Sequence, residues 1–304
     1  MRIAIAGSSG LLGTALGTSL TEDGHQVIRL VRHEARGEDE RPWDPMSRVI
    51  AGPGLDDVDA VVNLAGAGIG NRPWTSSYRR AILTSRVEGT RTLARALADS
   101  PRRRAPRTLL VPSAVGVYGA ERGDEVLDEG ASTGDDFLAR VCRLTEAAAQ
   151  PAQAVGVRVV SLRTGIVLSS HGGFLQVQRP LYLAGLGGPI DSGEQWLSWI
   201  SREDHVRAMR HLLLESALEG PVNVTAPGAV HQREFARTYA ASLNRPCRLM
   251  LPSAALVPLL GPDMVREVVR AGQRVVPDRL LRDGFTFHQP RLVQALDAVR
   301  AGSS

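Results

Sequence analysis

A glycine-rich turn between an aliphatic run and a helical pattern constrains this chain more than any other feature. Residues 2–6 read Arg-Ile-Ala-Ile-Ala, a short aliphatic run that is typical of a buried parallel strand. Residues 7–13 read Gly-Ser-Ser-Gly-Leu-Leu-Gly, and leucines then continue at helical spacing through Leu16 and Leu20. A strand, a glycine turn and a helix in this order predict the phosphate-binding start of a dinucleotide fold.

Each of the three glycines has a separate expected role in this turn. Gly7 permits the tight turn, Gly10 lets the backbone approach a pyrophosphate, and Gly13 lets the helix pack close to the strand. The start of the helix offers free N–H groups and a partial positive charge to the anion. A glycine-rich turn without any ligand is the alternative, but the strand before it and the helix after it favour a nucleotide site.

The chain contains no lysine, because all 36 of its Lys and Arg residues are arginine. A Schiff-base lysine is therefore excluded, and with it pyridoxal phosphate and class-I aldolase chemistry. A P-loop lysine is excluded for the same reason.

Composition indicates a globular protein of ordinary charge. With 304 residues, 43% hydrophobic content and a net charge of +4, the chain can bury a large core. The arginines at 102–104 and Arg107 lie beside prolines and are expected in a solvated loop, not in a nucleic-acid site. No apolar run is long enough to span a membrane, and neither the two cysteines nor the scattered histidines have metal-ligand spacing. We expect a cytoplasmic monomer or homodimer with no nucleic-acid, membrane or metal partner.

Strand and helix patterns alternate through the first half of the chain. Expected strands at 27–31, 59–64, 108–111 and 157–162 are separated by helical patterns, including long ones at 77–98 and 137–149. This alternation predicts an α/β fold, a Rossmann-type doubly wound parallel sheet whose ligand lies at the carboxyl ends of the strands. We assign residues 1–168, completed by about 196–227, to this domain, and residues 169–195 and 228–304 to a smaller C-terminal substrate lobe. That lobe is expected to begin with a glycine-punctuated loop and to contain helices at 231–243 and 252–269; at least one of Trp196 and Trp199 is expected in the core.

Several further motifs occur in a fixed order along the chain. They are Val-Asn-Leu-Ala-Gly-Ala-Gly-Ile (62–69), Thr-Ser-Arg (84–86), Pro-Ser-Ala-Val-Gly-Val-Tyr-Gly (112–119), Leu-Arg-Thr-Gly-Ile-Val-Leu (162–168), Gly-Leu-Gly-Gly-Pro-Ile (185–190), Trp-Leu-Ser-Trp-Ile (196–200), Gly-Pro-Val-Asn-Val (220–224), Gln-Arg-Val-Val-Pro (273–277) and Asp-Gly-Phe-Thr-Phe (283–287). Together with the glycine turn, they resemble the extended short-chain dehydrogenase/reductase (SDR) superfamily. The resemblance is strongest to its atypical epimerase-family branch, which is similar to nucleotide-sugar epimerases.

This resemblance implies a set of cofactor-binding residues. Residues of the glycine loop would hold the pyrophosphate, the segment after the third expected strand would line the cofactor, an arginine in the following helix would contact it, and the 164–167 segment would lie near the nicotinamide. The implied residues are Gly7, Ser9, Gly10, Leu11, Leu12, Leu64, Ala65, Gly66, Arg86, Thr164 and Val167.

Arg32 indicates which nicotinamide nucleotide is bound. It follows the second expected strand, where NAD-dependent enzymes usually place Asp or Glu for the ribose hydroxyls. An arginine there can grip a 2′-phosphate with two hydrogen bonds, so the sequence favours NADP(H). The alternative is an ordinary exposed arginine in an arginine-rich chain.

The chain departs from the superfamily at the catalytic triad of Ser or Thr, Tyr and Lys. No tyrosine lies on the helix expected at 137–149, and no lysine exists to depress the pKa of one. An alignment anchored on Glu146 places Leu138 and Cys142 at the Tyr and Lys positions, and another gap places Phe137 and Val141 there. The usual Ser/Thr position falls on Ala114.

The remaining groups that could transfer a proton are few. We predict Ser113 and Tyr118 as the candidate catalytic residues, although in relatives this tyrosine more often packs structurally. A thiol role for Cys142 is less favoured, since a lone buried cysteine is usually inert. Two hypotheses follow: an NADP(H)-dependent oxidoreductase or epimerase-like enzyme with a degenerate triad acting on an unknown small molecule, or a non-catalytic NADP(H)-binding sensor or scaffold.

Overall fold

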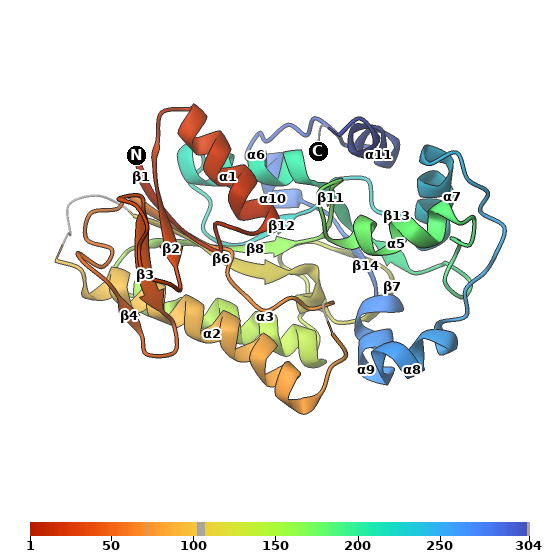
Figure 1. Cartoon of the computed structure of the whole chain (residues 1–304), viewed down its shortest axis with the longest axis horizontal. Helices are drawn as coiled ribbons and strands as arrows, with labels where there is room; N and C mark the ends of the chain where they lie inside the picture. Colours follow the sequence, from red (N-terminus) through yellow and green to blue (C-terminus); the bar gives the residue numbers. More distant parts are fainter. Residues whose placement is uncertain (71, 102–106, 303–304) are drawn as a thin grey trace.

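A twisted sheet of eight strands forms the centre of the computed structural model, which describes residues 1–70, 72–101 and 107–302 (Figure 1). The arginines at 102–104 lie outside these ranges. The strand order is β12-β8-β6-β5-β1-β2-β3-β4, and every pairing is parallel except that of β3 with β4. The strands are β1 (Arg2–Ala6), β2 (Gln26–Val31), β3 (Glu40–Asp44), β4 (Val49–Ile50), β5 (Ala60–Asn63), β6 (Thr108–Ala114), β8 (Arg158–Thr164) and β12 (Gly220–Val224).

Helices cover both faces of this sheet, which confirms the doubly wound α/β fold (Figure 1). Helices α1 (Leu11–Glu22) and α6 (Arg202–Leu214) pack on one face, and α2 (Ser76–Asp99), α3 (Phe137–Ala147) and α4 (Gln150–Gln153) pack on the other. Side chains of β1 alternate between the two faces: Ile3 and Ile5 lie in the core under α1 and α6, and Ala4 and Ala6 lie in the core under α2. Because both faces are buried, residues 3–6 of β1 are continuously apolar.

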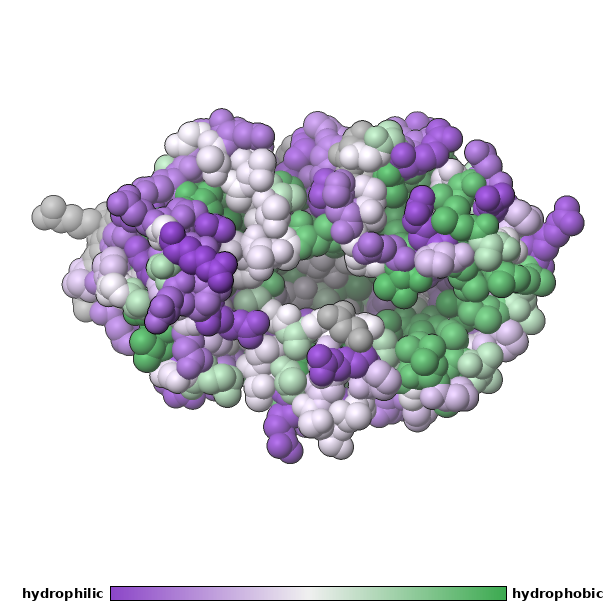
Figure 2. Space-filling model, in the orientation of Figure 1, coloured by the Kyte–Doolittle hydropathy of each residue, from purple (hydrophilic) through white to green (hydrophobic). Residues whose placement is uncertain are grey.

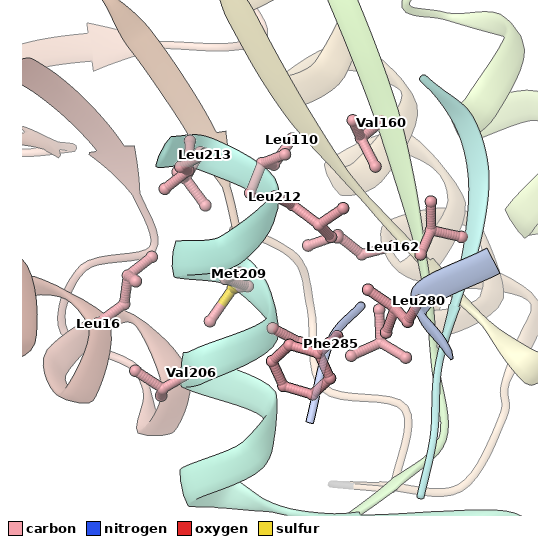
Figure 3. Close-up of a cluster of buried hydrophobic side chains, with 14 of the residues drawn as sticks. Leu16, Leu110, Val160, Leu162, Val206, Met209, Leu212, Leu213, Leu280 and Phe285 are labelled. Atoms are coloured by element: carbon pink, nitrogen blue, oxygen red, sulfur yellow. The ribbon is translucent and has the colours of Figure 1, made fainter. Parts of the chain in front are cut away.

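The core under α1 and α6 is the larger of the two. Figure 3 shows Leu16 of α1 and Met209 and Leu212 of α6 gathered with strand residues such as Leu110 and Leu162, all nearly or fully buried. Phe285, from the segment after α10 (Asp278–Arg282), closes this cluster. The end of the chain is therefore held against the central sheet.

Capping side chains fix where three of the helices begin. Thr75 accepts a hydrogen bond from the Tyr78 N–H at the start of α2, and Asp136 accepts one from Ala139 at the start of α3. Ser201 does the same for α6. Helix α1 differs, because its first residue follows Gly10 and no side chain caps it.

A third buried cluster includes Tyr182, Trp199 and Phe235, and a fourth joins Leu127 to Val275. We call residues 169–195 and 228–302 the C-terminal lobe, following the division predicted from the sequence. The elements not yet introduced are β7 (Glu121–Leu127), β9 (Ile166–Leu168), β10 (Trp196–Leu197), β11 (Trp199–Ser201), β13 (Val230–His231), β14 (Gly272–Val275), α5 (Phe174–Leu183), α7 (Gln232–Ser242), α8 (Val257–Leu260), α9 (Pro262–Met264), α11 (Leu292–Arg300), the 3₁₀ turns Val115–Tyr118 and Ser253–Leu256, and the π-helical turn Val265–Val269.

Some expectations about local structure were wrong. Arg107 is buried, not solvated, and its guanidinium donates to the Leu55 carbonyl and to Ser100. The helix expected over 252–269 is broken into short pieces, with Gly261 at a φ of 82° between α8 and α9. Trp199 is in the core as expected, while Trp196 stays partly exposed and stacks with His231.

Candidate nucleotide-binding and reaction site

The glycine loop after β1 lies at the point where the strand order reverses. β1 pairs with β2 on one side and with β5 on the other, so the loop is flanked by the carboxyl ends of both neighbours. Ligands of doubly wound sheets bind at such a switch point. Gly7 has a φ of +77°, and a Cβ there would lie 2.7 Å from the Leu64 carbonyl carbon and oxygen. The chain after β5 therefore passes directly over Gly7.

The start of α1 leaves N–H groups free to bind an anion. The first helical hydrogen bond runs from the Thr14 N–H to the Gly10 carbonyl at 2.9 Å, so Leu11, Leu12 and Gly13 precede it. No side chain caps this end, and Ser9 and Gly10 are exposed. A pyrophosphate would satisfy these donors and the positive end of the helix, so the cradle fits a dinucleotide.

The segment after β5 lies against this loop. The Leu64 N–H donates to the Ala6 carbonyl at 2.9 Å, and the Ala65 N–H donates to the Asn63 carboxamide oxygen at 3.1 Å. Gly66 leaves room for Arg86 of α2: a Cβ on Gly66 would lie 3.1 Å from the Arg86 guanidinium carbon. The structure thus brings residues 64–66 and Arg86 together beside the glycine loop.

The charged guanidinium of Arg86 forms hydrogen bonds only with neutral acceptors among the described residues. Its Nη1 donates to the carbonyls of Ala67 at 2.8 Å and Ile82 at 3.2 Å. Burial lowers the pKa of the Arg86 guanidinium, which nevertheless stays charged at any physiological pH. A partly buried cation in this position is suited to an anionic or hydroxyl-bearing ligand.

Arg32 lies at the carboxyl end of β2, next to the end of β1. The residue is exposed, and its guanidinium makes no hydrogen bond or ion pair with another residue that the structure describes. A shallow groove of about 720 Å³ runs from Ser8 and Ser9 along α1 and β2 to His25. His25 precedes β2, so the groove leads away from the carboxyl ends of the strands. Arg32 does not line that groove, so we do not assign the nucleotide to it.

Helix α3 presents Leu138, Cys142 and Glu146 to the end of β6. Leu138 contacts Gly116, and the Cys142 sulfur lies 3.8 Å from the Ala114 carbonyl oxygen. Of the two registers that the sequence left open, this geometry supports the one with Leu138 and Cys142 at the positions of the usual Tyr and Lys. Burial raises the pKa of the Cys142 thiol to about 11, so it stays protonated and unreactive near neutral pH.

Phe137 and Val141, the alternative pair, face elsewhere. The Phe137 ring packs edge-on against Trp74 at 5.2 Å between centroids and lies under the Arg79 guanidinium. Val141 is buried in the fold. Neither side chain reaches the end of β6 in the way that Leu138 and Cys142 do.

Ser113 is joined to a buried ion pair that the sequence did not predict. Its hydroxyl donates to Glu146 Oε1 at 2.6 Å, and Arg163 donates to both Glu146 oxygens at 3.1 Å. Burial alone would lower the pKa of Arg163, but its hydrogen bonds to the Glu146 carboxylate raise it, so the arginine is firmly charged. Ser113 is half-buried, and its hydroxyl proton is directed to a carboxylate.

Tyr118 occupies a different environment from Ser113. Its side chain is fully buried; its hydroxyl donates to the Asn223 side-chain oxygen at 2.6 Å and accepts from Arg163 at 3.1 Å. Burial raises the pKa of this tyrosine, an effect opposite to the activation that a catalytic tyrosine needs. The environment favours a structural role for Tyr118.

Thr164 and Val167 continue the site along the edge of the sheet. Thr164 ends β8 and its hydroxyl lies 3.0 Å from Nε2 of His205, while Val167 lies in β9 and pairs with Ile200. His205 is fully buried, its Nδ1 has no hydrogen-bond partner among the described residues, and burial lowers its pKa to about 4.

Three residues near the site were missed as functional groups: Glu146, Arg163 and His205. From the sequence, Glu146 was used only to align the helix with the family, and Arg163 was noted only as part of a motif. An arginine in a buried strand nevertheless predicts a buried acidic partner. Nothing in the local sequence around His205 predicts its contact with Thr164.

Neither a membrane-spanning helix nor a metal-binding cluster occurs in the part of the chain that the structure describes. No helix there is both long enough and apolar enough to cross a membrane. No group of three or more His, Cys, Asp or Glu side chains is arranged to hold a metal ion in those ranges.

Comparison with known proteins identifies similar sequences. Residues 3–225 match the NAD dependent epimerase/dehydratase family, and residues 251–299 match a domain of unknown function, DUF1731. The chain is 44% identical over 294 residues to the epimerase family protein Mb2239 of Mycobacterium bovis, covering 97% of this chain and 96% of that protein.

Solved structures show the same fold. The structure of human epimerase family protein SDR39U1 (isoform 2) with NADPH is 33% identical, with a TM-score of 0.90 and 99% coverage of both chains. UDP-N-acetylglucosamine 4-epimerase from Bacillus cereus has a TM-score of 0.75 at 16% identity, covering 100% of this chain and 99% of that one, which supports the fold alone.

Proposed function

The chain belongs to the NAD dependent epimerase/dehydratase family, and we propose that it is an NADP(H)-binding oxidoreductase or epimerase-like protein whose catalytic triad is degenerate. The observation that carries the proposal is the cradle of Gly7, Gly10 and Gly13 under an uncapped helix start. When bound there, a nicotinamide nucleotide supplies hydride donation or acceptance.

Arg32 supports NADP(H) over NAD(H) as the cofactor. The residue is exposed at the end of β2, where an acidic residue would otherwise accept bonds from ribose hydroxyls. Its charge suits the 2′-phosphate, which is the group that distinguishes the two cofactors. The human relative named above was solved with NADPH, which agrees with this choice.

We assign the rest of the cofactor contacts to the loop and its neighbours. Ser9, Leu11 and Leu12 lie at the open start of α1, Leu64, Ala65 and Gly66 lie over Gly7, and Arg86 supplies a cation beside them. Thr164 and Val167 lie farther along the same edge of the sheet, on the side of β6 and β8 where the nicotinamide would be expected.

Ser113 is the residue we propose for proton transfer. Its hydroxyl is half-buried and bonded to Glu146, so a proton can pass between a bound substrate and this carboxylate through Ser113. Arg163 donates to both oxygens of Glu146 and so fixes the orientation of this carboxylate. Tyr118, the second candidate from the sequence, is the weaker one because its hydroxyl is buried and already paired.

A non-catalytic NADP(H)-binding sensor or scaffold is the second candidate function. It rests on Leu138 and Cys142, which we assign to the positions of the usual tyrosine and lysine because they lie against the end of β6. Neither side chain activates a proton donor near pH 7, since one is a hydrocarbon and the pKa of the other is raised to about 11 by burial.

Two measurements on the full chain test the proposal and separate the candidates. Titration with NADPH and NADH should show tighter NADPH binding, and equal affinity for the two would remove the role of Arg32. Absorbance at the nicotinamide band then follows turnover of a substrate panel. We expect negligible turnover of common nucleotide sugars, because a missing general acid costs about 10²–10⁴ in rate.

The Ser113→Ala variant distinguishes the two functions once any turnover is found. An enzyme that uses Ser113 loses most of that turnover in the variant and keeps its NADPH affinity, whereas Ser242→Ala, in α7, serves as the matched control. Turnover that survives both Ser113→Ala and Tyr118→Phe would place the catalytic centre elsewhere. Both candidates predict negligible turnover of common nucleotide sugars, so NADPH binding favours the sensor or scaffold only if the other substrates of the panel are not turned over either.

A further inference from the structure

The C-terminal lobe exposes apolar side chains that the fold does not use. Val177 and Leu181 of α5 are 81% and 38% exposed, and Leu186, Leu249 and Met250 in the following segments are about half exposed or more. In Figure 2, hydrophobic residues gather on the right of the view, where Figure 1 places α5, α7 and α8. They lie next to a hollow near the middle of the view. Exposed apolar surface of this kind commonly marks a binding site.

Helix α5 has two apolar faces, and only one of them is buried. Leu175 and Tyr182 are seven residues apart and face the core of the lobe. Val177 and Leu181 are four residues apart, share a different face of the helix and are both exposed, Val177 almost fully and Leu181 in part. A helix that only supports the lobe would place polar residues on that face.

The exposed apolar residues of the 183–190 loop continue into the segment before α8. A Cβ on Gly185 would lie 3.6 Å from Pro246, and the Leu251 N–H donates to the Pro189 carbonyl at 2.8 Å. A Cβ on Gly188 would lie 1.7 Å from the Leu249 carbonyl oxygen, so the segment that carries Leu249 and Met250 packs against the loop that carries Leu186. We call Val177, Leu181, Leu183, Leu186, Leu249 and Met250 the apolar surface.

The helix that carries part of this surface begins at the proposed cofactor site. Gly173, the residue before α5, lies against the glycine loop: a Cβ there would be 3.8 Å from Leu11 Cδ2. Helix α5 therefore starts at the cofactor loop, and its exposed apolar face leads away from it. A protein partner or a second copy of this chain would not need its docking surface to begin at that loop.

The three side-chain positions beside Ser113 are poor in groups that recognise hydroxyls. Ala114 and Leu138 lie where the superfamily usually places a Ser or Thr and a Tyr, and Cys142 beside them is buried. A sugar hydroxyl that faced these three side chains would stay unpaired, which costs affinity. Ala114, Leu138 and Cys142 in the reaction site and the apolar surface therefore favour the same kind of molecule, one with an apolar body.

We propose that the substrate or ligand of this protein has an extended apolar body, such as an acyl or prenyl chain, that lies along α5 and the apolar surface. This inference rests on the proposed function, because it places the reactive end of the ligand beside the cofactor. Such a molecule differs from a nucleotide sugar in the part that the protein would bind, which is an apolar chain and not a sugar.

A fluorescent probe tests the assignment directly. The probe is 11-(dansylamino)undecanoate, titrated into the NADPH-loaded full chain, with 1-dodecanol and UDP-glucose as competitors. We expect the probe to bind, 1-dodecanol to displace it and UDP-glucose to leave it bound. The double variant Val177→Asp/Leu181→Asp should weaken probe binding at least about tenfold and leave NADPH affinity unchanged.

The matched control is Val155→Asp/Val293→Asp, which places the same charges at two exposed valines outside the apolar surface. The proposal is overturned if the α5 variant binds the probe as wild type does, or if UDP-glucose displaces the probe. It is also overturned if light scattering shows that the α5 variant converts a dimer to a monomer, since the surface would then bind a second copy. Failure of NADPH to bind is measured separately and concerns the proposed function alone.

Discussion

A Cβ on Gly13 would lie 2.2 Å from the carbonyl oxygen of Gly7, so helix α1 packs on the glycine loop at a distance that no side chain permits. Gly10 is different, because its φ is −80° and a Cβ there would meet only the Gly7 carbonyl, at 3.3 Å. Gly7 and Gly13 thus serve the fold, and Gly10 is free to serve the ligand.

We predict that Gly10→Val abolishes cofactor binding and leaves the fold in place. The valine methyl groups occupy the space through which a pyrophosphate approaches the helix start, and losing the favoured glycine at this cap costs only about 1 kcal/mol. Calorimetric titration with NADPH and a urea unfolding curve measure the two effects.

Gly17→Ala is the control for the glycine loop, since a Cβ there would have its nearest neighbour at 4.0 Å. It should bind NADPH as wild type does. Wild-type affinity in Gly10→Val would mean that the loop does not cradle phosphate.

Arg32→Asp should reverse the cofactor preference. The aspartate repels a 2′-phosphate and accepts hydrogen bonds from the ribose hydroxyls of NADH. A charge-assisted contact contributes about 1.5–3 kcal/mol, so the ratio of the two dissociation constants should change at least about tenfold. Arg300→Asp, at a residue with a mostly exposed side chain in the last helix, should leave the ratio unchanged. If Arg32→Asp leaves this ratio unchanged, residues other than Arg32 bind the 2′-phosphate.

The sheet and its helices were predictable because their signals are local. Buried parallel strands read as aliphatic runs, and α2 was expected at 77–98 and occurs at Ser76–Asp99. Strand β3 was missed because its sequence, Glu-Arg-Pro-Trp-Asp, carries no such run. It is held by pairing with β2, by burial of Trp43 and by the ion pair of Arg41 with Asp57, none of which neighbouring residues reveal.

The candidate site also contains a part that the sequence predicts and a part that it does not. The glycine loop is a contiguous motif, so its residues could be named from the sequence. The network of Ser113, Glu146 and Arg163 joins three elements, and Ser113 and Glu146 are 33 residues apart. Only the register of α3 against β6 brings them together, so spacing along the chain could not predict the contact.

Tyr118→Phe should destabilise the protein without weakening cofactor binding. The variant leaves the Asn223 side-chain oxygen without its donor in a buried position, which costs about 1–3 kcal/mol in the free energy of unfolding. Chemical denaturation and NADPH titration test the two parts. Tyr78→Phe, which removes a partly buried hydroxyl bonded to the Gly68 carbonyl, should cost less. Unchanged stability with lost turnover would instead make Tyr118 a catalytic residue.

His205 should make the fold sensitive to mild acid. Its pKa is lowered by burial from 6.5 to about 4, so the folded protein keeps this ring neutral at pH values where the unfolded chain protonates it. The unfolded state therefore binds more protons between these two pKa values, and stability falls as pH drops from 6.5 toward 4. Above pH 6.5 the ring is neutral in both states and contributes no pH dependence. Between pH 7.5 and pH 5 the loss from this one residue is about 2 kcal/mol.

Urea unfolding of wild type and His205→Gln at the two pH values isolates this contribution. The variant should lose about 2 kcal/mol less than wild type on acidification, whatever its stability at pH 7.5, because glutamine does not titrate. His33→Gln, which removes an exposed ring, should follow wild type. Equal acid losses in wild type and His205→Gln would show that the buried ring gains its proton without opening the fold.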